Sequence, residues 1–321
     1  MTDRTVTGTE VEEEAPASYY GRPVLKAPVW RWPVPVYFFT GGLAGASATL
    51  ALASRLRGDD ALARRAVFVA AVGALVSPAL LVADLGRPER FVNMLRVAKP
   101  TSPMSVGTWV VSAFVPAAAG AAVCERTERL RGVGRVLELV AGVLGPVMCT
   151  YTAVILADTA VPSWHEARRE LPFVFAGSAM ASAGAAAVAL SPVNGPGAGA
   201  ARRLLGAGVV VEGVASQAME RLHPDACAPY RGAGRAATLA GRARALTVAG
   251  ATIALTLGRR RRPAAIAGAA LVLTGALFER LCVSEAGVES ARAPQATVGP
   301  QRRRLDAARD GAGHPQQGPW A

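Results

Sequence analysis

The chain has 321 residues, of which 51% are hydrophobic and only 18% are charged, and its formal net charge is +12. A soluble domain usually carries about 25% charged residues. The basic excess does not indicate nucleic-acid binding, because the arginines form short clusters between long apolar runs, where topology and anionic lipid account for them. The composition therefore favours an integral membrane protein whose partner is the lipid bilayer, and not a soluble or nucleic-acid-binding protein.

Eight apolar segments approach the length of about 20 residues that a helix needs to cross the hydrocarbon core of a bilayer. They are apolar nearly all round, which leaves no polar face to cover a soluble core. The sequence predicts an all-α fold, a polytopic membrane protein of about eight transmembrane helices in two four-helix halves. The segments are 34–53, 66–83, 105–123, 136–157, 172–190, 204–219, 243–257 and 264–283.

The two ends of the sequence differ from this pattern. Residues 1–18 and 286–321 are polar and rich in Gly, Pro and charge, so we expect mostly disordered tails around a transmembrane domain at 19–285. No secretory signal is visible near the start, so the first span is expected to direct insertion. The distribution of Lys and Arg over the internal loops places both termini and the 84–104 loop outside, but the basic tails reverse that count.

The stretch YYGRPVLKAPVWRWPVPVYFF at 19–39 leads into the first span and includes Trp32 and Tyr37. Its aromatic residues are typical of an interfacial belt. Its spaced prolines favour an extended segment before the helix, which would suit docking against another protein. Both interpretations remain open from the sequence.

The loop between the second and third spans, ADLGRPERFVNMLRVAKPTSPMSVGTW at 83–109, is rich in polar groups. Asp84 lies three residues before Arg87, so the two side chains could pair and simply stabilise the helix end. An acid and several donors around an apolar mouth could equally bind a quinone headgroup, whose carbonyls need donors and whose reduction needs protons. Both alternatives remain open.

The end of the fourth span, MCTYTAVILADTAVPSWHEARRELP at 148–172, places the hydroxyl group of Tyr151 within the membrane and Asp158 near the exit. With eight spans, this end lies on the same side as the 84–104 loop. We therefore expect the two stretches to form one shared site.

Ionisable residues inside spans are costly and are functional candidates for that reason. Glu212 and Glu279 are the proton-relay candidates of the later spans. Glu212 could equally be a neutral acid whose hydrogen bonds a neighbouring helix satisfies. Glycines inside the spans, as in GGLAGAS, are predicted to let helices approach closely.

Cofactor-binding motifs of other kinds are missing from the sequence. None of the four cysteines forms a CxxC pair, and no predicted span contains a histidine. Iron–sulfur clusters need closely spaced thiolates, and a haem held within a bundle needs axial ligands on the helices. We therefore expect no haem, no iron–sulfur cluster and no metal site in this protein.

At these motifs the sequence resembles the NrfD / polysulfide reductase membrane-subunit family. The similarity rests on the 19–39 stretch with the following TGGLAGAS, on DLGRPERFVNMLRVAKPTSPMSVGTW, on YTAVILADTAVPSWHEAR and on the motif at 286–302. It implies a quinone-interacting subunit of a multi-subunit oxidoreductase, which binds menaquinone or another quinone without haem. Its partners would be a ferredoxin-like 4Fe-4S subunit and a molybdopterin oxidoreductase subunit.

The resemblance also implies where the quinone lies: near the start of the first span and beside a tyrosine late in the fourth. The His and Asn that a well-studied member has in the first span are absent here. The expected quinone-site residues are Trp32, Tyr37, Thr40, Asp84, Arg87, Tyr151 and Asp158, of which Asp84, Arg87 and Tyr151 are expected to act in the chemistry. A passive membrane anchor for an iron–sulfur/molybdopterin enzyme and a proton-conducting subunit centred on the buried glutamates are the alternative functions.

Overall fold

The computed structural model describes residues 25–293, apart from 86, 88, 90, 128 and 129, together with residue 296. The predicted tail at 1–18 and the residues from 297 onward lie outside this part. Within it, every regular element is a helix. The elements are α1 (Pro33–Leu56), α2 (Asp60–Asp84), α3 (Phe91–Leu95), α4 (Pro103–Thr127), α5 (Arg131–Ala157), α6 (Pro162–His165), α7 (Leu171–Leu190), α8 (Ala198–Leu222), η2 (Ala228–Tyr230), α9 (Arg235–Leu255), η3 (Leu257–Arg259) and α10 (Arg262–Arg292).

The eight predicted segments correspond, in order, to α1, α2, α4, α5, α7, α8, α9 and α10. Six of them, all except α8 and α9, are long and apolar enough to cross a membrane, and the protein is a multi-pass membrane protein. The helices α8 and α9 have comparable lengths of 25 and 21 residues but carry several arginines, which lowers their hydropathy. The last helix continues to Arg292, so the predicted boundary of the tail at 286 falls inside α10.

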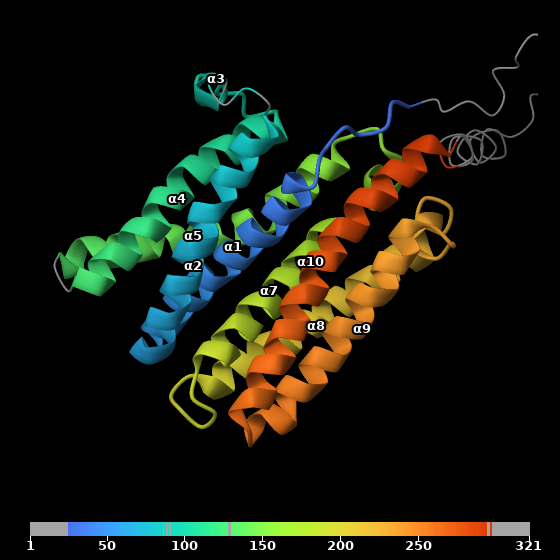
Figure 1. Cartoon of the computed structure of the whole chain (residues 1–321). Coiled ribbons are helices and arrows are strands. Elements are labelled where there is room, and N and C mark those ends of the chain that lie inside the picture. Colours follow the sequence, from blue (N-terminus) through green and yellow to red (C-terminus); the bar gives the residue numbers. More distant parts are fainter. Residues whose placement is uncertain are drawn as a thin grey trace, which may run out of the picture.

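The helices form two groups of four, which confirms the predicted halves (Figure 1). In the first half, α1 packs against α2 and α5, and α4 packs against α2 and α5. In the second half, α7 packs against α8 and α10, and α9 packs against α8 and α10. The halves meet mainly where α1 and α5 contact α7, so α1 lies at the centre of the molecule.

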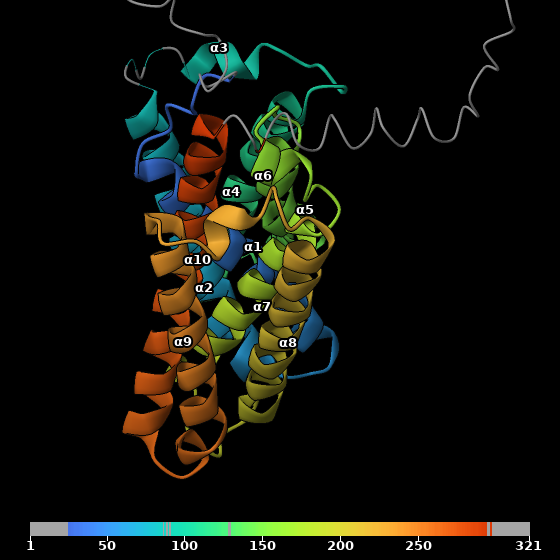
Figure 2. The same cartoon turned by 90° about the vertical axis from the view of Figure 1, so that its right-hand side faces the viewer.

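One end of the bundle carries α3 and α6, together with the segment between α8 and α9 (Figure 2). We call it the α3 end; here α1 begins and both α2 and α5 end. The turns that join α1 to α2 and α7 to α8 lie at the opposite end. The end of the predicted fourth span is thus on the same side as the loop after the second span, as the sequence indicates.

Glycines bring helix backbones close together at several contacts, of which two are described here. A Cβ atom on Gly45 of α1 would lie 2.5 Å from the carbonyl oxygen of Gly145 on α5. A Cβ atom on Gly177 of α7 would lie 2.8 Å from the Cα atom of Glu212 on α8. No larger residue fits at either contact without moving a helix, which confirms the predicted packing role of the intramembrane glycines.

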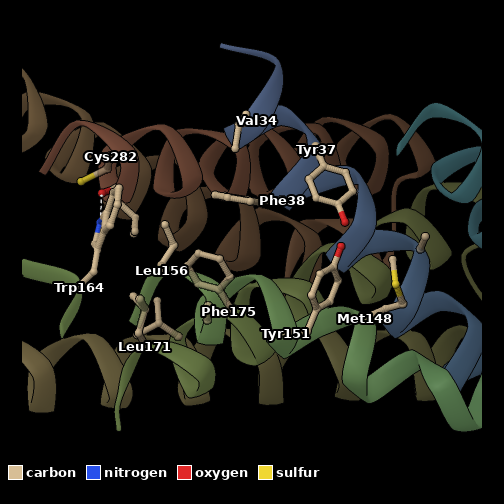
Figure 3. Packing of buried hydrophobic residues seen from close by; sticks show 14 of the residues in the cluster. Val34, Tyr37, Phe38, Met148, Tyr151, Leu156, Trp164, Leu171, Phe175 and Cys282 are labelled. Carbon is tan, nitrogen blue, oxygen red and sulfur yellow. Dashed lines mark hydrogen bonds between the residues drawn. The ribbon is translucent and has the colours of Figure 1, made fainter. Parts of the chain in front are cut away.

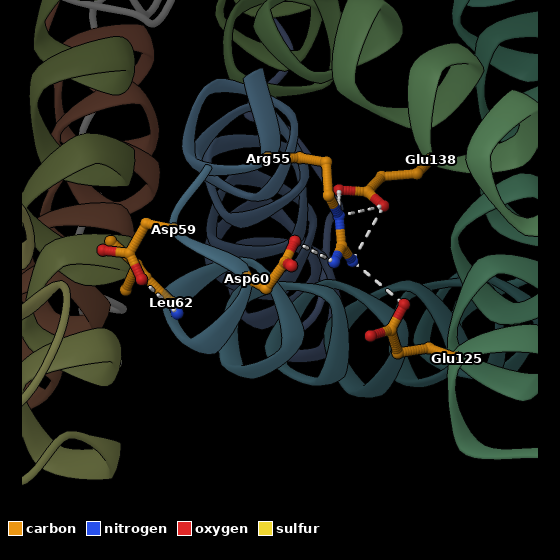
Figure 4. Close-up of polar contacts among 6 residues, drawn as sticks. All are labelled: Arg55, Asp59, Asp60, Leu62, Glu125 and Glu138. Atoms are coloured by element: carbon orange, nitrogen blue, oxygen red, sulfur yellow. Dashed lines mark hydrogen bonds and ion pairs between the residues drawn. The ribbon is translucent and has the colours of Figure 1, made fainter. Parts of the chain in front are cut away.

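At the end opposite α3, one arginine joins all four helices of the first half (Figure 4). The guanidinium group of Arg55 on α1 contacts Asp60 of α2 at 2.8 Å, Glu125 of α4 at 2.9 Å and Glu138 of α5 at 3.1 Å. Glu138 is buried, whereas Asp60 is largely exposed. Because Arg55 is the counter-charge of a buried carboxylate, this ion-pair network holds the four helices in register.

Candidate functional site

A cavity of about 320 Å³ lies between α1, α2, α4 and α5 at the α3 end. Its wall is mostly aromatic and aliphatic, with Trp30 and Phe38 on one side and Met104 on another. Only a few polar residues interrupt this wall, chiefly Tyr37 and Tyr151. Small-molecule sites typically have such an apolar lining with a few fixed polar groups, and volumes of roughly 300–1,000 Å³.

Two tyrosines face each other across this cavity. Tyr37 of α1 and Tyr151 of α5 are both buried, and their hydroxyl groups point toward one another (Figure 3). Neither hydroxyl makes a hydrogen bond to another residue that the structure describes. Gly107 of α4 leaves room for the second ring, since a Cβ atom there would lie 2.6 Å from the Tyr151 ring. Two hydroxyl donors are therefore available to a ligand.

An acidic residue completes the polar lining. Asp84 is the last residue of α2 and lines the same cavity. Its Oδ1 atom is buried and has no hydrogen-bond partner within the described part of the protein. Buried carboxylate oxygens are rarely left in this state. A proton, or a donor on a ligand, would satisfy this oxygen.

The segment before α1 forms part of the cavity wall. The Trp30 ring stacks on the Trp164 ring of α6, with 5.4 Å between the ring centroids, and meets the Phe38 ring edge-on at 6.2 Å. The indole nitrogen of Trp164 donates to the carbonyl oxygen of Val283 on α10, at 2.8 Å. The predicted extended segment is thus anchored to the bundle through this pair of tryptophans.

Residues 23–195, more than half of the sequence, match the family model described as "Polysulphide reductase, NrfD". The chain belongs to the NrfD family. The match covers the whole first half, which contains the cavity, and continues through α7. The C subunit of polysulfide reductase from Wolinella succinogenes is 32% identical over 96 residues, which are 27% of this protein and 30% of that subunit. The similarity to this relative thus extends over about a third of its length or less.

Three of the predicted site residues, Tyr37, Asp84 and Tyr151, line this one cavity. Trp32 does not line it; its side chain is 66% exposed just before α1. Thr40 does not line it either. Its hydroxyl lies 3.0 Å from that of Ser77, so it belongs to the contact between α1 and α2.

The two remaining predicted residues lie outside the cavity. Arg87 is exposed and forms no ion pair with any described residue, so the pairing with Asp84 that the spacing left open does not occur in the structure. The helix α2 ends at Asp84, so Asp84 and Arg87 do not share a helix in which a three-residue spacing would place their side chains on one face. Asp158 is exposed at the end of α5.

Two residues of the site were missed by sequence reasoning. Trp30 is one of several aromatic residues in the 19–39 stretch, and its position in the wall depends on its contact with Trp164, far along the sequence. Gly107 carries no polar group, and its role depends on the close approach of α4 to α5. A glycine four residues after the Pro103 that begins α4 was the available signal for such a close approach.

The predicted proton-relay residues lie in the second half of this NrfD protein, away from the cavity lined by Tyr37, Asp84 and Tyr151. Glu212 of α8 and Glu279 of α10 line a smaller cavity, of about 40 Å³. Both side chains are buried. Among the residues described here, no three His, Cys, Asp or Glu side chains gather in a way that could hold a metal ion.

Proposed function

We propose that the cavity between α1, α2, α4 and α5 binds menaquinone or another quinone of the membrane pool. The observation that carries this proposal is the pairing of two free tyrosine hydroxyls with the unpartnered Oδ1 atom of Asp84 around an otherwise apolar space. The lining residues belong to four helices that are long and apolar enough to cross the membrane. A quinone dissolved in the bilayer can therefore approach it between the helices.

The chemistry of the lining fits a quinone. The ring and tail of a quinone are apolar and would suit the wall formed by Trp30 and Phe38, while Tyr37 and Tyr151 would donate hydrogen bonds to its carbonyl oxygens. A bound quinone would supply two-electron chemistry that takes up or releases two protons. The protein contributes orientation through the two hydroxyls, exclusion of water by the aromatic wall, and a proton held at Oδ1 of Asp84.

The electrons require a partner in this proposal. The relative from Wolinella succinogenes is named as the C component of a polysulfide reductase, and the name denotes one subunit among several. We infer that this protein is likewise the membrane subunit of an oxidoreductase complex. Its proposed partners are a ferredoxin-like 4Fe-4S subunit and a molybdopterin subunit, and the exposed α3 end, next to the cavity, is the proposed docking face.

Extraction of the purified complex tests the proposal against the passive-anchor alternative. The complex is isolated in mild detergent, extracted with organic solvent and assayed for quinone by mass spectrometry. We expect quinone in proportion to the protein. A passive anchor, or a proton-conducting subunit without quinone chemistry, would yield only the small amount of quinone that is dissolved in the co-purified lipid.

Replacement of Tyr151 by Phe removes one donor and keeps the ring. We expect quinone affinity to fall about tenfold, because the loss of a buried hydrogen bond to a ligand carbonyl weakens the binding free energy by about 1–2 kcal/mol. Binding is measured by the quenching of tryptophan fluorescence, since Trp30 lines the cavity. The matched control is Thr150→Val. The Thr150 hydroxyl lies outside the cavity and donates to the carbonyl oxygen of Pro146 at 3.0 Å. Equal affinity in Tyr151→Phe and wild type would remove Tyr151 from the site.

Replacement of Gly107 by Ala tests the shape of the cavity. The added methyl group would lie 2.6 Å from the Tyr151 ring, so the ring must move. We expect a loss of quinone affinity by about tenfold or more, because the displaced ring changes both the donor and the free volume. Gly120→Ala on the same helix is the control, since its methyl group meets only the movable end of Leu137. An unaltered affinity in Gly107→Ala would show that this packing does not shape the site.

A further inference from the structure

The second half of the protein contains a polar cavity that the quinone chemistry does not use. It has a volume of about 40 Å³ and lies among α7, α8, α9 and α10, with Tyr230 of η2 in its wall. A space of this size can hold at least one water molecule if polar groups surround it. Glu212 and Glu279 supply such groups from α8 and α10.

Three polar atoms of this cavity lack a protein partner. They are Oε2 of Glu212, Oε1 of Glu279 and the hydroxyl oxygen of Tyr230, each buried and without a hydrogen bond to any residue in the described ranges. The three residues are 9%, 8% and 5% exposed. The sequence left open that a neighbouring helix would bond a neutral Glu212. In the structure, no described residue bonds Oε2 of Glu212. Buried groups in this state usually bind water or exchange protons.

The charges of the cluster do not balance when both acids are ionised. Arg280 is 2% exposed and pairs with Glu279, and it donates a hydrogen bond to the carbonyl oxygen of Phe175 at 2.9 Å. Its guanidinium group also lies 3.7 Å from the centroid of the Phe175 ring. One arginine thus neutralises one carboxylate. The second carboxylate, on Glu212, pairs with no cation in the part of the chain that the structure describes, and an unpaired buried charge is costly.

Polar groups lead from this cluster toward the segment that joins α8 to α9 at the α3 end. Glu220 lies two turns beyond Glu212 on α8, and it pairs with Arg244 of α9 and, at 3.8 Å, with Arg231. The side chain of Arg244 is 54% exposed, whereas that of Glu220 is 13% exposed, so the pair forms the mouth of the cavity. Burial raises the pKa of Tyr230 well above its ordinary value, so its hydroxyl stays protonated and can bond water without ionising.

We propose that this cavity is a proton-exchange site whose acceptor is Oε2 of Glu212. A hydronium ion at the mouth passes its proton through cavity water to this oxygen, which leaves a neutral carboxylic acid and a water molecule, and the reverse transfer releases the proton. The titratable and charged groups that line the site are Glu279 and Cys282 from α10, Glu220 from α8, Arg244 from α9 and Tyr230 from η2, while Val174 lines it from α7. Arg280 pairs with Glu279, and Arg231 pairs with Glu220. This site does not depend on quinone binding.

Infrared spectroscopy of the full-length protein in lipid nanodiscs tests the acceptor. A protonated carboxyl group gives a carbonyl band that is separate from carboxylate bands and shifts when its proton is replaced by deuterium. The spectrum of Glu212→Gln is subtracted from that of the wild type, so that the bands of other protonated carboxyl groups, such as that of Asp84, cancel. We expect the difference spectrum to contain the carbonyl band, which changes in amplitude with pH and shifts in D₂O without unfolding. A difference spectrum without this band, or with a band that is independent of pH, would overturn the proposal.

The entrance is tested by filling the cavity. Ser216 lines it, and Ser216→Leu should slow the deuterium shift of the band by at least about tenfold. The matched control is Gln217→Leu, the exposed neighbour on the same helix, which should exchange like wild type. If Ser216→Leu does not fold, Ala240→Val narrows the same cavity from α9.

Equal rates of deuterium exchange in the cavity-filling variant and in Gln217→Leu would contradict proton entry through this cavity. No quinone is present, so the outcome is separate from that of the quinone proposal.

Discussion

Asp84→Asn should lower quinone-linked electron transfer by about 100-fold while the quinone remains bound. Asparagine keeps the size of the side chain and an acceptor oxygen, but it cannot take up a proton at the cavity. General acid–base groups typically contribute 10²- to 10⁴-fold to rate. The unpartnered Oδ1 atom of Asp84 is the group beside the cavity that this variant changes.

Two measurements separate a chemical role from a structural one in this variant. Turnover is followed with a soluble quinone analogue in the purified complex, and quinone content is measured after extraction. Asp158→Asn is the comparison, because that carboxylate is exposed and lies outside the cavity lining. A variant that loses quinone and turnover together would reassign Asp84 to binding. A variant with normal turnover would remove it from the chemistry.

The second large effect is expected on stability. Arg55→Met should lower the free energy of unfolding by about 3–5 kcal/mol, because it leaves the buried Glu138 carboxylate without a counter-charge. Glu125 loses its partner as well, but it is more exposed and contributes less. We expect a lower midpoint of thermal unfolding in detergent. The midpoint is measured by size-exclusion chromatography of samples heated to increasing temperatures.

A matched variant and a rescue make this prediction specific. Arg57→Met changes an exposed arginine two residues away in the sequence and should leave the midpoint close to that of wild type. Adding Glu138→Gln to Arg55→Met removes the unpaired charge, so the double variant should recover part of the lost stability. If the single Arg55 variant is as stable as the Arg57 variant, the network does not hold the first half together.

The helices were predictable because a membrane helix is recognised by length and apolarity, which are local properties of the sequence. The residues at which the helices end were not predictable in this way. The predicted tail boundary at 286 falls inside α10, because polar residues such as Glu289 continue the helix and bind to a neighbour, here the backbone N–H group of Ala236. The lower apolarity of α8 and α9 has a related cause. Their charged residues pair within the bundle, as Glu220 and Arg244 do.

Site residues were predictable from the sequence where a motif places a polar residue at the end of a helix. They were not predictable where the rotation of a helix decides whether a side chain faces the cavity. Asp84 and Tyr151 line one cavity, as the common side of the two stretches suggested, and Tyr37, named through the family resemblance, lines it too. Thr40 lies one turn further along α1, yet its hydroxyl faces Ser77. A stretch of sequence indicates depth in the membrane, but the packing between helices decides which side chains reach a cavity.

The two proposed sites share one end of the bundle, and this has a consequence for the energetics of the membrane. Asp84 ends α2 at the α3 end, and the Glu220–Arg244 mouth lies near the segment that joins α8 to α9 at the same end. Protons exchanged at both sites then come from one aqueous compartment. If the electron donor docks at that end too, turnover moves no charge through the hydrocarbon layer, and the membrane potential neither drives nor opposes it. A partner on the far side would couple each transferred charge to about 2.3 kcal/mol per 100 mV.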